Sequence, residues 1–433
     1  MQRLLYQKLL DWKQDKQHKP LILQGARQVG KTWLMKDFGR KEYRNYIYVN
    51  FDKDTWAKDL FAQDYNVERI LLLLQANTGI KAEPGQTLII LDELQEATRG
   101  LGALKYFCED APQYHVMAAG SLLGITLHQG TSFPVGKVNM LTLYPMSFDE
   151  FLLAMQQDAK VQLLRSKDWQ IIAVMHELFM DLLRQYYFVG GMPEAVLSYV
   201  TDKDLKKVRT IQKEIIVAYR SDISKHAPTN DIPRINMVMD SIPAQLAKEN
   251  RKFIYGVLKQ GARAKEFEMA IQWLMDAGIV YKINLAKEAV VPLKFYEDFS
   301  SFKLFLSDCG LMGCLAETPA SLILNGNNIL KEYKDAFTEA YVLQQLRNHF
   351  DTVYYWSSND SKCEIDMMVQ IEERVLPIEV KAEDNVHAQS LRNFCTCKYP
   401  GMKGLRCSTK GYIDQEWMEN IPLYVVDSFF TDN

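Results

Sequence analysis

Short apolar runs alternate with amphipathic stretches through the first third of the chain. Continuous aliphatic runs are typical of strands buried on both faces, whereas apolar residues three or four positions apart are typical of helices. The runs that predict strands span residues 21–23, 45–51, 87–92 and 115–119. Helices are predicted between them, most clearly over 67–75. Strands and helices in alternation predict an α/β domain built on a parallel sheet.

Length and composition suit several hydrophobic cores. The chain has 433 residues, 48% hydrophobic and 24% charged, which predicts about two to four domains. A net charge of -3 and a pI near 6.2 argue against a globally basic surface for nucleic acid, although a local basic groove is compatible with them.

The chain carries no sign of secretion or of membrane insertion. No apolar stretch is long enough to span a bilayer, and the N-terminus lacks the uninterrupted apolar segment of a signal peptide. The seven cysteines are odd in number and scattered. Cys395, Cys397 and Cys407 have no histidine at ligand spacing nearby, so a zinc site is not expected. We therefore expect a cytoplasmic protein with reduced thiols and no membrane partner.

A phosphate-binding loop is predicted directly after the first strand. Its residues are Gly25, Ala26, Arg27, Gln28, Val29, Gly30, Lys31 and Thr32. The glycines let successive backbone N–H groups point at phosphate oxygens, while Lys31 reaches the β and γ oxygens and the Thr32 hydroxyl ligates Mg²⁺. The following helix directs its N-terminal dipole at the same phosphates. The loop predicts binding of a nucleoside triphosphate; a glycine-rich turn before a helix is the alternative.

Acidic residues end the predicted strand 87–92. Asp92 is expected to hold the Mg²⁺ shell, and Glu93 to orient or polarise the water that attacks the γ-phosphate. The next strand delivers Ser121 to the same edge of the sheet, where ligands bind in open α/β folds. Ser121 is a candidate to bond the γ-phosphate or the attacking water. The predicted catalytic residues are therefore Lys31, Asp92, Glu93 and Ser121.

Several stretches together resemble a known family. They are residues 19–32, 91–95, 119–121 and 143–151. They resemble the prokaryotic AAA+-type ATPases whose C-terminal half is a restriction-endonuclease-like domain, and the resemblance spans nearly the whole chain. It implies an AAA+-type core with a parallel sheet at 1–165, a helical lid at 166–235, a winged-helix-like region at 236–325 and a small α/β endonuclease-like domain at 326–433. It also implies ATP as the nucleotide.

Two further features of the resemblance concern ATP contacts outside the loop. Gly190, Gly191 and Pro193 are similar to the glycine-proline signature of signal-transduction ATPases, which packs against the nucleotide base; a loop with a proline opening a helix explains the same residues. Lys137 stands where the family often has an arginine finger, but lysine lacks the bidentate fork. Other candidate fingers are Arg99, Arg184 and Arg220. The oligomeric state is left open.

Residues 236–282 have helical periodicity. Phe267, Ile271 and Leu274 share one helix face, and Gly278 ends the helix before a strand at 279–283. This outline resembles a winged helix-turn-helix, in which two basic side chains, Arg263 and Lys265, would contact DNA. Three acids on the same helix, Glu266, Glu268 and Asp276, would repel a phosphate backbone. DNA contact and plain domain packing both remain open.

The last third predicts a metal site. The predicted elements are a helix at 333–350 and strands at 364–369 and 376–381. Glu379 and Lys381 share a strand face, and strand pairing brings Asp366 beside them. With Glu339 they follow the PD-(D/E)XK pattern of restriction-endonuclease-like folds, in which carboxylates hold Mg²⁺ and the lysine stabilises charge at a scissile phosphate. A salt-bridge cluster on a scaffold that no longer cuts is the alternative.

These patterns favour an ATP-binding protein that hydrolyses ATP with Mg²⁺. Its nucleotide state would control how the C-terminal half engages a partner, either DNA or another nucleic acid, or a protein. One alternative is a metal-dependent DNA nuclease that the ATPase gates. Another is a non-catalytic switch or scaffold in which ATP stays bound.

Overall fold

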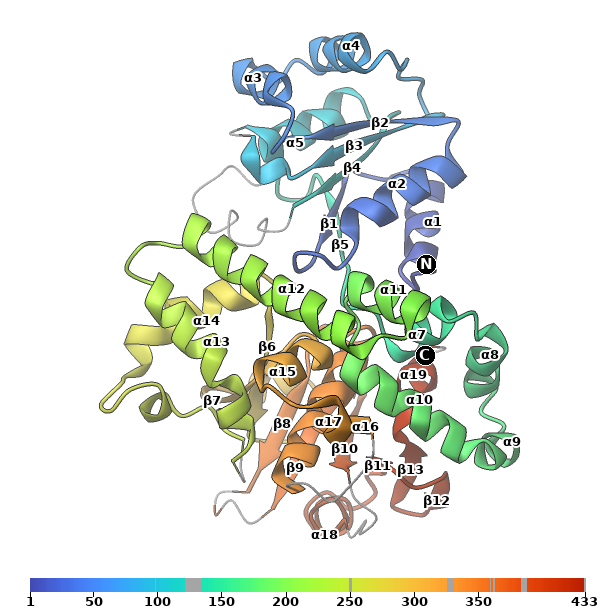
Figure 1. The fold of residues 1–433 in the computed structure, drawn as a ribbon, viewed down its shortest axis with the longest axis vertical. Helices are drawn as coiled ribbons and strands as arrows, with labels where there is room; N and C mark the ends of the chain where they lie inside the picture. The colour runs from blue at the N-terminus through green and yellow to red at the C-terminus, as the bar shows by residue number, and fades with distance from the viewer. Residues whose placement is uncertain are drawn as a thin grey trace. The chain divides into compact units, whose positions relative to one another are not determined.

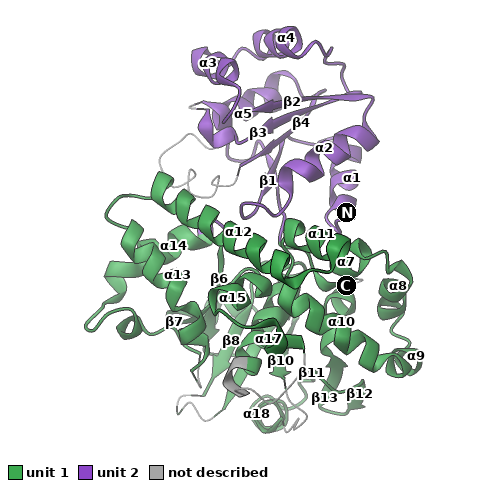
Figure 2. Cartoon of the chain, viewed as in Figure 1, with its two compact units in different colours: residues 1, 145–275, 279–433 green, residues 2–144, 276–278 purple. Residues whose placement is uncertain are grey.

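The computed structural model describes most of the chain. The described residues are 1–97, 99–120, 134–248, 251–324, 331–358, 360, 363–382 and 388–431, without the side chains of 331–333. They divide into two compact units (Figure 2). The first unit contains residues 2–144 and 276–278, and the second contains residue 1, 145–275 and 279–433. No described helix is long and apolar enough to cross a membrane.

The first unit is built on a five-stranded sheet in the order β2-β3-β4-β1-β5. The strands are β1 (Leu21–Gln24), β2 (Asn45–Asn50), β3 (Thr87–Asp92), β4 (His115–Ala119) and β5 (Asn139–Thr142). Every pairing is parallel, which confirms the predicted parallel sheet. Continuous aliphatic runs form these strands because helices cover both faces of the sheet.

Helices from both sides bury this sheet (Figure 1). The helices are α1 (Tyr6–Gln14), α2 (Lys31–Glu42), α3 (Thr55–Gln63), α4 (Val67–Thr78), α5 (Gly100–Asp110) and the short η1 (Leu94–Glu96). Side chains of α3, α4 and α5 join alternate residues of β2, β3 and β4 in one apolar core. α2 packs on β2, β3 and β4 with its own buried residues, Leu34, Met35 and Phe38. The sheet thus holds the carboxyl end of β1, where the predicted loop begins, at the same edge as the carboxyl end of β3, with β4 between the two strands.

The second unit joins the middle and the end of the chain in one sheet. Its eight strands run in the order β12-β13-β11-β10-β9-β8-β6-β7. The strands are β6 (Val280–Ala286), β7 (Glu297–Leu306), β8 (Tyr354–Ser357), β9 (Glu364–Ile371), β10 (Arg374–Lys381), β11 (Gly404–Ser408), β12 (Ile413–Gln415) and β13 (Met418–Pro422). The strand predicted as a wing, β6, pairs with β7 and also with β8. The predicted winged-helix region therefore shares a sheet with the predicted endonuclease-like region, and a separate winged helix is not confirmed.

Thirteen α-helices are described in the second unit. They are α7 (Phe148–Ala154), α8 (Asp158–Ser166), α9 (Trp169–Val174), α10 (His176–Val189), α11 (Pro193–Asp202), α12 (Leu205–His226), α13 (Ile232–Leu246), α14 (Ala264–Asp276), α15 (Cys309–Leu315), α16 (Ala320–Leu324), α17 (Lys331–Leu346), α18 (Gln389–Asn393) and α19 (Val426–Phe430). The predicted helix face is confirmed in α14, where Phe267, Ile271 and Leu274 are buried. Arg263 and Lys265 are exposed near its start. The division into four predicted domains stays a prediction.

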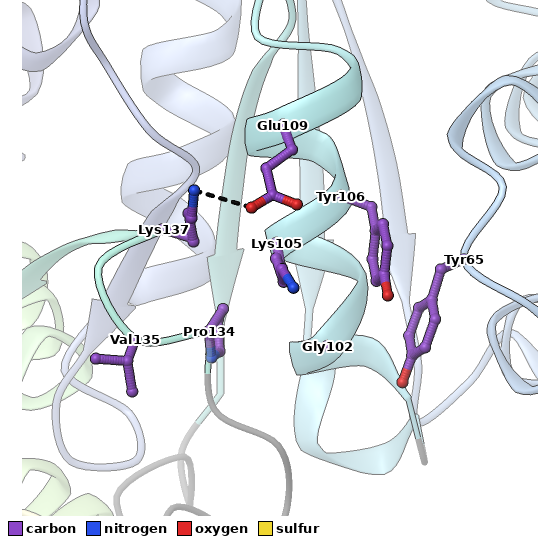
Figure 3. Close-up of a pocket in the computed structure, with 8 residues that line it drawn as sticks. All are labelled: Tyr65, Gly102, Lys105, Tyr106, Glu109, Pro134, Val135 and Lys137. Carbon is purple, nitrogen blue, oxygen red and sulfur yellow. Dashed lines mark ion pairs between the residues drawn. The ribbon is translucent and has the colours of Figure 1, made fainter.

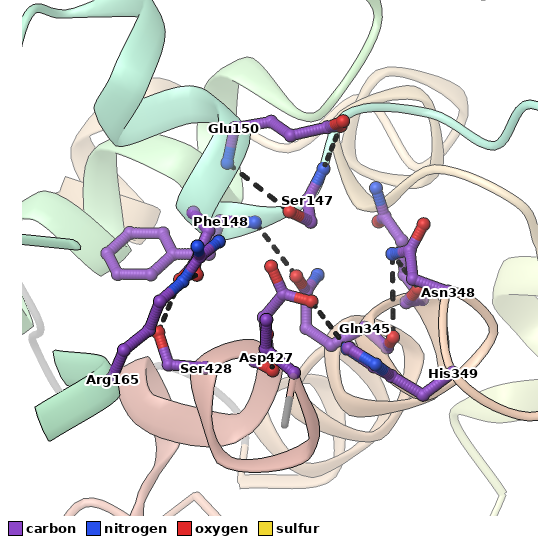
Figure 4. A network of polar contacts seen from close by, with 12 residues as sticks. Ser147, Phe148, Glu150, Arg165, Gln345, Asn348, His349, Asp427 and Ser428 are labelled. Carbon is purple, nitrogen blue, oxygen red and sulfur yellow. Dashed lines mark hydrogen bonds and ion pairs between the residues drawn. The ribbon is translucent and has the colours of Figure 1, made fainter. Parts of the chain in front are cut away.

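A buried polar network ties α7 to the C-terminal helix (Figure 4). α7 begins with a capping box between Ser147 and Glu150. Asp149, the residue before Glu150, accepts a hydrogen bond from Ser428 of α19 at 2.7 Å and pairs with Arg165 at 3.1 Å. Burial, with the nearby Asp427 charge, raises the pKa of Asp149 to about 7. Residues directly after the first unit are thus held by the last helix of the chain.

Gly190 and Gly191 turn the chain tightly between α10 and α11. Gly190 has a φ of +73°, and a Cβ there would lie 2.3 Å from an oxygen of Asp308. A Cβ at Gly191 would lie 2.1 Å from the carbonyl oxygen of Met146. Asp308 accepts hydrogen bonds from the backbone N–H groups of Gly191 and Leu311. The double glycine is therefore explained by close packing within the second unit.

Gly190→Ala is expected to destabilise the second unit by about 3 kcal/mol or more, because the new methyl group meets a buried, hydrogen-bonded carboxylate. Gly261 is a matched control, since its φ is +78° but no atom lies within 4 Å of its Cβ position. Gly261→Ala is expected to cost only about 1 kcal/mol. Chemical denaturation of both variants measures the difference. Equal losses would show that the contact with Asp308 is unimportant.

His115, at the start of β4, is a buried titratable group of the first unit. Its ring lies 4.0 Å from that of His18 and 5.3 Å from that of Trp12, measured between ring centroids. Burial lowers the pKa of His115 to about 4, and the charges of His18 and Lys13 act in the same direction. The folded protein therefore keeps this imidazole neutral at pH values where the unfolded chain, with the usual pKa of 6.5, takes up a proton.

We expect this difference to make the first unit acid-sensitive. The contribution of neutral His115 to the free energy of unfolding is complete above pH 6.5 and is lost as the pH falls toward 4. The loss is at most about 3 kcal/mol. Thermal unfolding at about pH 7.5 and about pH 5 measures it. His115→Phe should narrow the gap between the two midpoints, and His226→Phe, at the end of α12, should leave it unchanged. A gap that His115→Phe does not alter would rule out His115 as the source.

Candidate nucleotide-binding site

The predicted phosphate-binding loop connects β1 to α2 and depends on backbone conformations that favour glycine. Gly25 has a φ of +140°, and a Cβ there would lie 2.2 Å from the carbonyl oxygen of Leu143. Gly30 has a φ of +95° and caps α2. The guanidinium of Arg3 donates a hydrogen bond to the carbonyl oxygen of Val29 at 2.7 Å. Backbone packing and Arg3 therefore fix the loop at the N-terminus of α2.

Lys31 is the first residue of α2 and lies within the loop. Its side-chain nitrogen donates hydrogen bonds to the carbonyl oxygens of Gly25 and Ala26, at 2.7 and 2.8 Å. Only 7% of the residue is exposed. A buried ammonium next to the N-terminal N–H groups of a helix gives this loop the charge and the donors that suit phosphate.

The structure brings the predicted Mg²⁺ ligands together. The Thr32 hydroxyl donates a hydrogen bond to Asp92 at 2.7 Å. The same carboxylate oxygen accepts a second bond from the Tyr48 hydroxyl at 2.9 Å. Burial raises the pKa of Asp92, and the bonds from Thr32 and Tyr48 oppose that rise because they favour the charged carboxylate. Thr32 and Asp92 can therefore share one metal ion.

Tyr48 is a site residue that the sequence did not reveal. It lies on β2, whose residue Asn50 stands opposite Asp92 in the sheet register. Burial raises the pKa of Tyr48 to about 12, so its hydroxyl keeps its proton and acts as a donor to Asp92. Lys36 of α2 places its ammonium 3.4 Å from the centre of the Tyr48 ring. Only the pairing of β2 with β3 could have identified Tyr48 from the sequence. That pairing sets Asn50 opposite Asp92, and Tyr48 lies two residues before Asn50.

Glu93 follows Asp92 in an unusual backbone conformation. Its φ is +53°, which is uncommon for a residue with a Cβ. Its carboxylate accepts a hydrogen bond from the Gln95 side chain at 2.6 Å. The left-handed turn and Gln95 together hold Glu93 just beyond the strand end that carries Asp92, as expected for the residue that polarises water.

A second polar site forms in the other unit, where the four residues predicted for a nuclease come together. Glu339 lies on α17, Asp366 on β9, and Glu379 and Lys381 on β10. Antiparallel pairing of β9 and β10 lets the Val380 N–H donate to Asp366 at 2.8 Å. Lys381 pairs with Glu379 at 2.6 Å. The predicted cluster is thus a real, buried grouping of side chains.

Cations reach the same carboxylates. Lys303 and Lys381 hold the pKa of Asp366 below its usual value against the effect of its burial. Burial raises the pKa of Glu339 to about 8 and that of Glu379 to about 7. Within the described part of the chain, no group of three or more Asp, Glu, His or Cys side chains is arranged to hold a metal ion. The assignment of Glu339, Asp366 and Glu379 as Mg²⁺ ligands stays a prediction.

Three families match successive parts of the chain. Residues 17–152 match the AAA domain. The first unit is a P-loop ATPase domain. Residues 180–322 match a domain of unknown function (DUF8612), and residues 334–426 match another (DUF4143). These two families describe no activity, so the nuclease-like prediction for the C-terminal region is not confirmed. No curated protein matches the sequence.

Several solved structures show distant likeness. A Walker-type ATPase of Pyrococcus abyssi is 14% identical with a TM-score of 0.44, covering 72% of this chain and 94% of its own. The ORC2 protein of Aeropyrum pernix is 13% identical with a TM-score of 0.33, covering 77% and 91%. Cdc6p of Pyrobaculum aerophilum is 10% identical with a TM-score of 0.26, covering 75% and 96%.

Two predicted contacts to the nucleotide are not tested. Ser121, the candidate sensor, lies outside the described residues. Pro193 occupies the first turn of α11, as the helix-start interpretation predicts. It belongs to the second unit, and its predicted place against the base stays a prediction.

The candidate arginine fingers of the chain have partners within their own unit. Lys137 pairs with Glu109 at 2.8 Å beside a cavity of about 390 Å³ in the ATPase domain, which Tyr65 and Tyr106 also line (Figure 3). The other candidates pair as follows: Arg99 with the Gln63 carbonyl, Arg184 with Asp181 and Arg220 with Asp240. These contacts select none of the four candidates as the finger and leave the oligomeric state open.

Proposed function

We propose that this chain hydrolyses ATP at the site formed by the loop Gly25–Thr32 and the end of β3. The observation that carries the proposal is the hydrogen bond between Thr32 and Asp92, because it joins the two expected Mg²⁺ ligands beside the Lys31 ammonium. Thr32 and Asp92 would hold a Mg²⁺ ion that supplies positive charge to the phosphates, and Glu93 would polarise the attacking water. Lys31, Asp92 and Glu93, with Ser121 as sensor, are the proposed catalytic residues.

Calorimetry and phosphate release test this proposal. Titration of the purified chain with ATP and Mg²⁺ should show one site per chain, and phosphate should be released with multiple turnovers. GTP in the same titration tests the choice of base. Absence of heat with any adenine nucleotide at millimolar concentration would refute ATP binding. Tight binding with almost no turnover would instead favour a switch or scaffold.

We further propose that the nucleotide state controls how the second unit engages a partner, DNA, another nucleic acid or a protein. The proposed division keeps an ATPase core at 1–165, a lid at 166–235, a winged-helix-like region at 236–325 and an endonuclease-like domain at 326–433. The exposed Arg263 and Lys265 near the start of α14 support a nucleic-acid partner. Binding of labelled DNA with ATP, with ADP and without nucleotide tests this control.

A metal-dependent DNA nuclease is the second candidate function. The observation that favours it is the grouping of Glu339, Asp366, Glu379 and Lys381 in one cluster. If it cuts, carboxylates of this cluster would hold Mg²⁺ and Lys381 would stabilise the charge that develops on the phosphate. Linear, supercoiled and single-stranded DNA incubated with Mg²⁺ or Mn²⁺ tests the idea. Cleavage that persists in Asp366→Ala would have another source.

A further inference from the structure

Two cations from the middle of the chain end inside the carboxylate cluster of the second unit. The Arg251 guanidinium, from the segment after α13, donates a hydrogen bond to Glu339. It also forms ion pairs with Asp366 and with Asp335, each at 3.8 Å. Lys303 of β7 pairs with Glu364 at 2.5 Å and with Glu339 at 3.9 Å. Neither cation belongs to the motif that predicted the cluster.

Arg251 is held firmly in this position. Its side chain is 14% exposed, and that of Glu339 only 2%. Its backbone φ is +50°, a conformation that residues with a Cβ rarely adopt. Burial opposes its charge, but Glu339 and Asp366 together raise the pKa of Arg251 above its usual value. The guanidinium is therefore a permanent charge placed among acids by an otherwise unfavourable backbone.

The cluster also contains unused acceptors. One carboxylate oxygen of Glu339 and one of Glu379 are buried without any hydrogen-bond partner, and the Glu339 oxygen has the Lys303 ammonium, 3.9 Å away, as a counter-ion. Buried carboxylate oxygens are normally satisfied by a donor or by a cation. Without Arg251, three cations would face five acids among the described residues. The cations are Lys303, Lys381 and Arg406, and the acids are Asp335, Glu339, Glu364, Asp366 and Glu379. Oxygen-rich, negatively charged groups of this kind bind Mg²⁺ and Mn²⁺.

We propose that Arg251 is an internal counter-ion that competes with a divalent cation for Glu339 and Asp366. With the guanidinium in place, the cluster is closed to the cation. When Arg251 withdraws, Glu339, Asp366 and Glu379 become available as ligands. The inference concerns the same cluster as the second candidate function, but it requires only cation binding and no cleavage.

Mn²⁺ binding to the nucleotide-free protein, followed by the electron paramagnetic resonance of free Mn²⁺, tests the competition. Arg251→Gln removes the charge and keeps the side chain polar, and it should bind one Mn²⁺ per chain about tenfold tighter than the wild type. The thermal midpoint of this variant should also rise more with Mn²⁺ than that of the wild type. Arg234→Gln is the matched control, since it removes an arginine paired with Asp231 and should leave Mn²⁺ binding unchanged.

The double variant Arg251→Gln with Asp366→Asn should lose the added affinity. Equal Mn²⁺ binding by Arg251→Gln and the wild type, or tight binding that survives Asp366→Asn, would overturn the proposal. If Arg251→Gln does not fold, Arg251→Lys takes its place, because its shorter ammonium lacks the fork and should admit Mn²⁺ at least about threefold more readily; unchanged affinity there would also overturn it. None of these readings depends on ATP turnover or DNA cleavage, so either function can fail separately.

Discussion

Lys31→Ala is expected to weaken ATP binding by about 100-fold or more. The substitution removes the ammonium that would contact the β- and γ-phosphates, and charge-assisted hydrogen bonds contribute about 1.5–3 kcal/mol each. It also removes the donor that now bridges the carbonyl oxygens of Gly25 and Ala26. The loop therefore loses both its charge and an internal tie. Isothermal titration calorimetry with ATP and Mg²⁺ measures the change.

Lys41→Ala is the control for this experiment. Lys41 lies on the same helix, α2, but it is exposed and pairs with Asp37 at 2.8 Å. We expect its ATP affinity to match that of the wild type, because surface ion pairs of this kind contribute little. If Lys31→Ala binds ATP as tightly as Lys41→Ala does, the loop is not the phosphate site and the proposed function fails.

Glu93→Gln is expected to bind ATP normally and to hydrolyse it about 100-fold more slowly or worse. The amide keeps the length of the side chain and one acceptor oxygen, so the contact with Gln95 can persist. It cannot carry the negative charge that polarises water, and a positioned base of this kind typically contributes about 100-fold or more. Asp92 and Thr32 are untouched, so Mg²⁺ and nucleotide should still bind. Single-turnover phosphate release, measured beside ATP affinity, separates the two effects.

A nearby glutamate provides the comparison for Glu93. Glu96 lies three residues further on, in η1, and pairs loosely with Lys58 at 3.7 Å. Glu96→Gln should turn over ATP at the wild-type rate. A Glu93→Gln protein that hydrolyses ATP as fast as Glu96→Gln would assign the water-activating role to another residue. A Glu93→Gln protein that fails to bind ATP would mean that Glu93 shapes the site rather than the reaction.

The ATPase domain shows how far local sequence can lead. The strands β1 to β4, the helix α4 and the loop Gly25–Thr32 are all predicted from runs of neighbouring residues. The structure confirms the strands and the helix and places the loop between β1 and α2. Phosphate binding by the loop stays a prediction. The apolar runs specify strands because both faces of the sheet are covered. The loop glycines specify backbone conformations that other residues rarely adopt. Both signals depend on only a few neighbouring residues, so they can be recognised from the sequence.

The second unit shows where that approach stops. Helix α17 and the hairpin of β9 and β10 were predicted correctly, with Glu339, Asp366 and Glu379 on them. The strand predicted after α14 suggested a wing, yet this strand, β6, pairs with β8, which follows it only after β7 and the helices α15, α16 and α17. Strand pairing over such distances depends on the competition among all available sheet edges. The residues of β6 alone therefore do not predict which strands it pairs with.

The sequence by itself determined the P-loop ATPase domain and the order of its secondary structure, because those signals arise from residues close together in the chain. Only the tertiary structure decided that Tyr48 donates to Asp92, that the double glycine is required by contacts with Asp308 and Met146, and that Arg251 enters the carboxylate cluster. Arg251 and Glu339 are separated by 88 positions. A contact at that separation depends on how whole helices and strands pack and on the need to pair every buried charge. The residues next to Arg251 and Glu339 in the sequence therefore do not reveal which partner each one has.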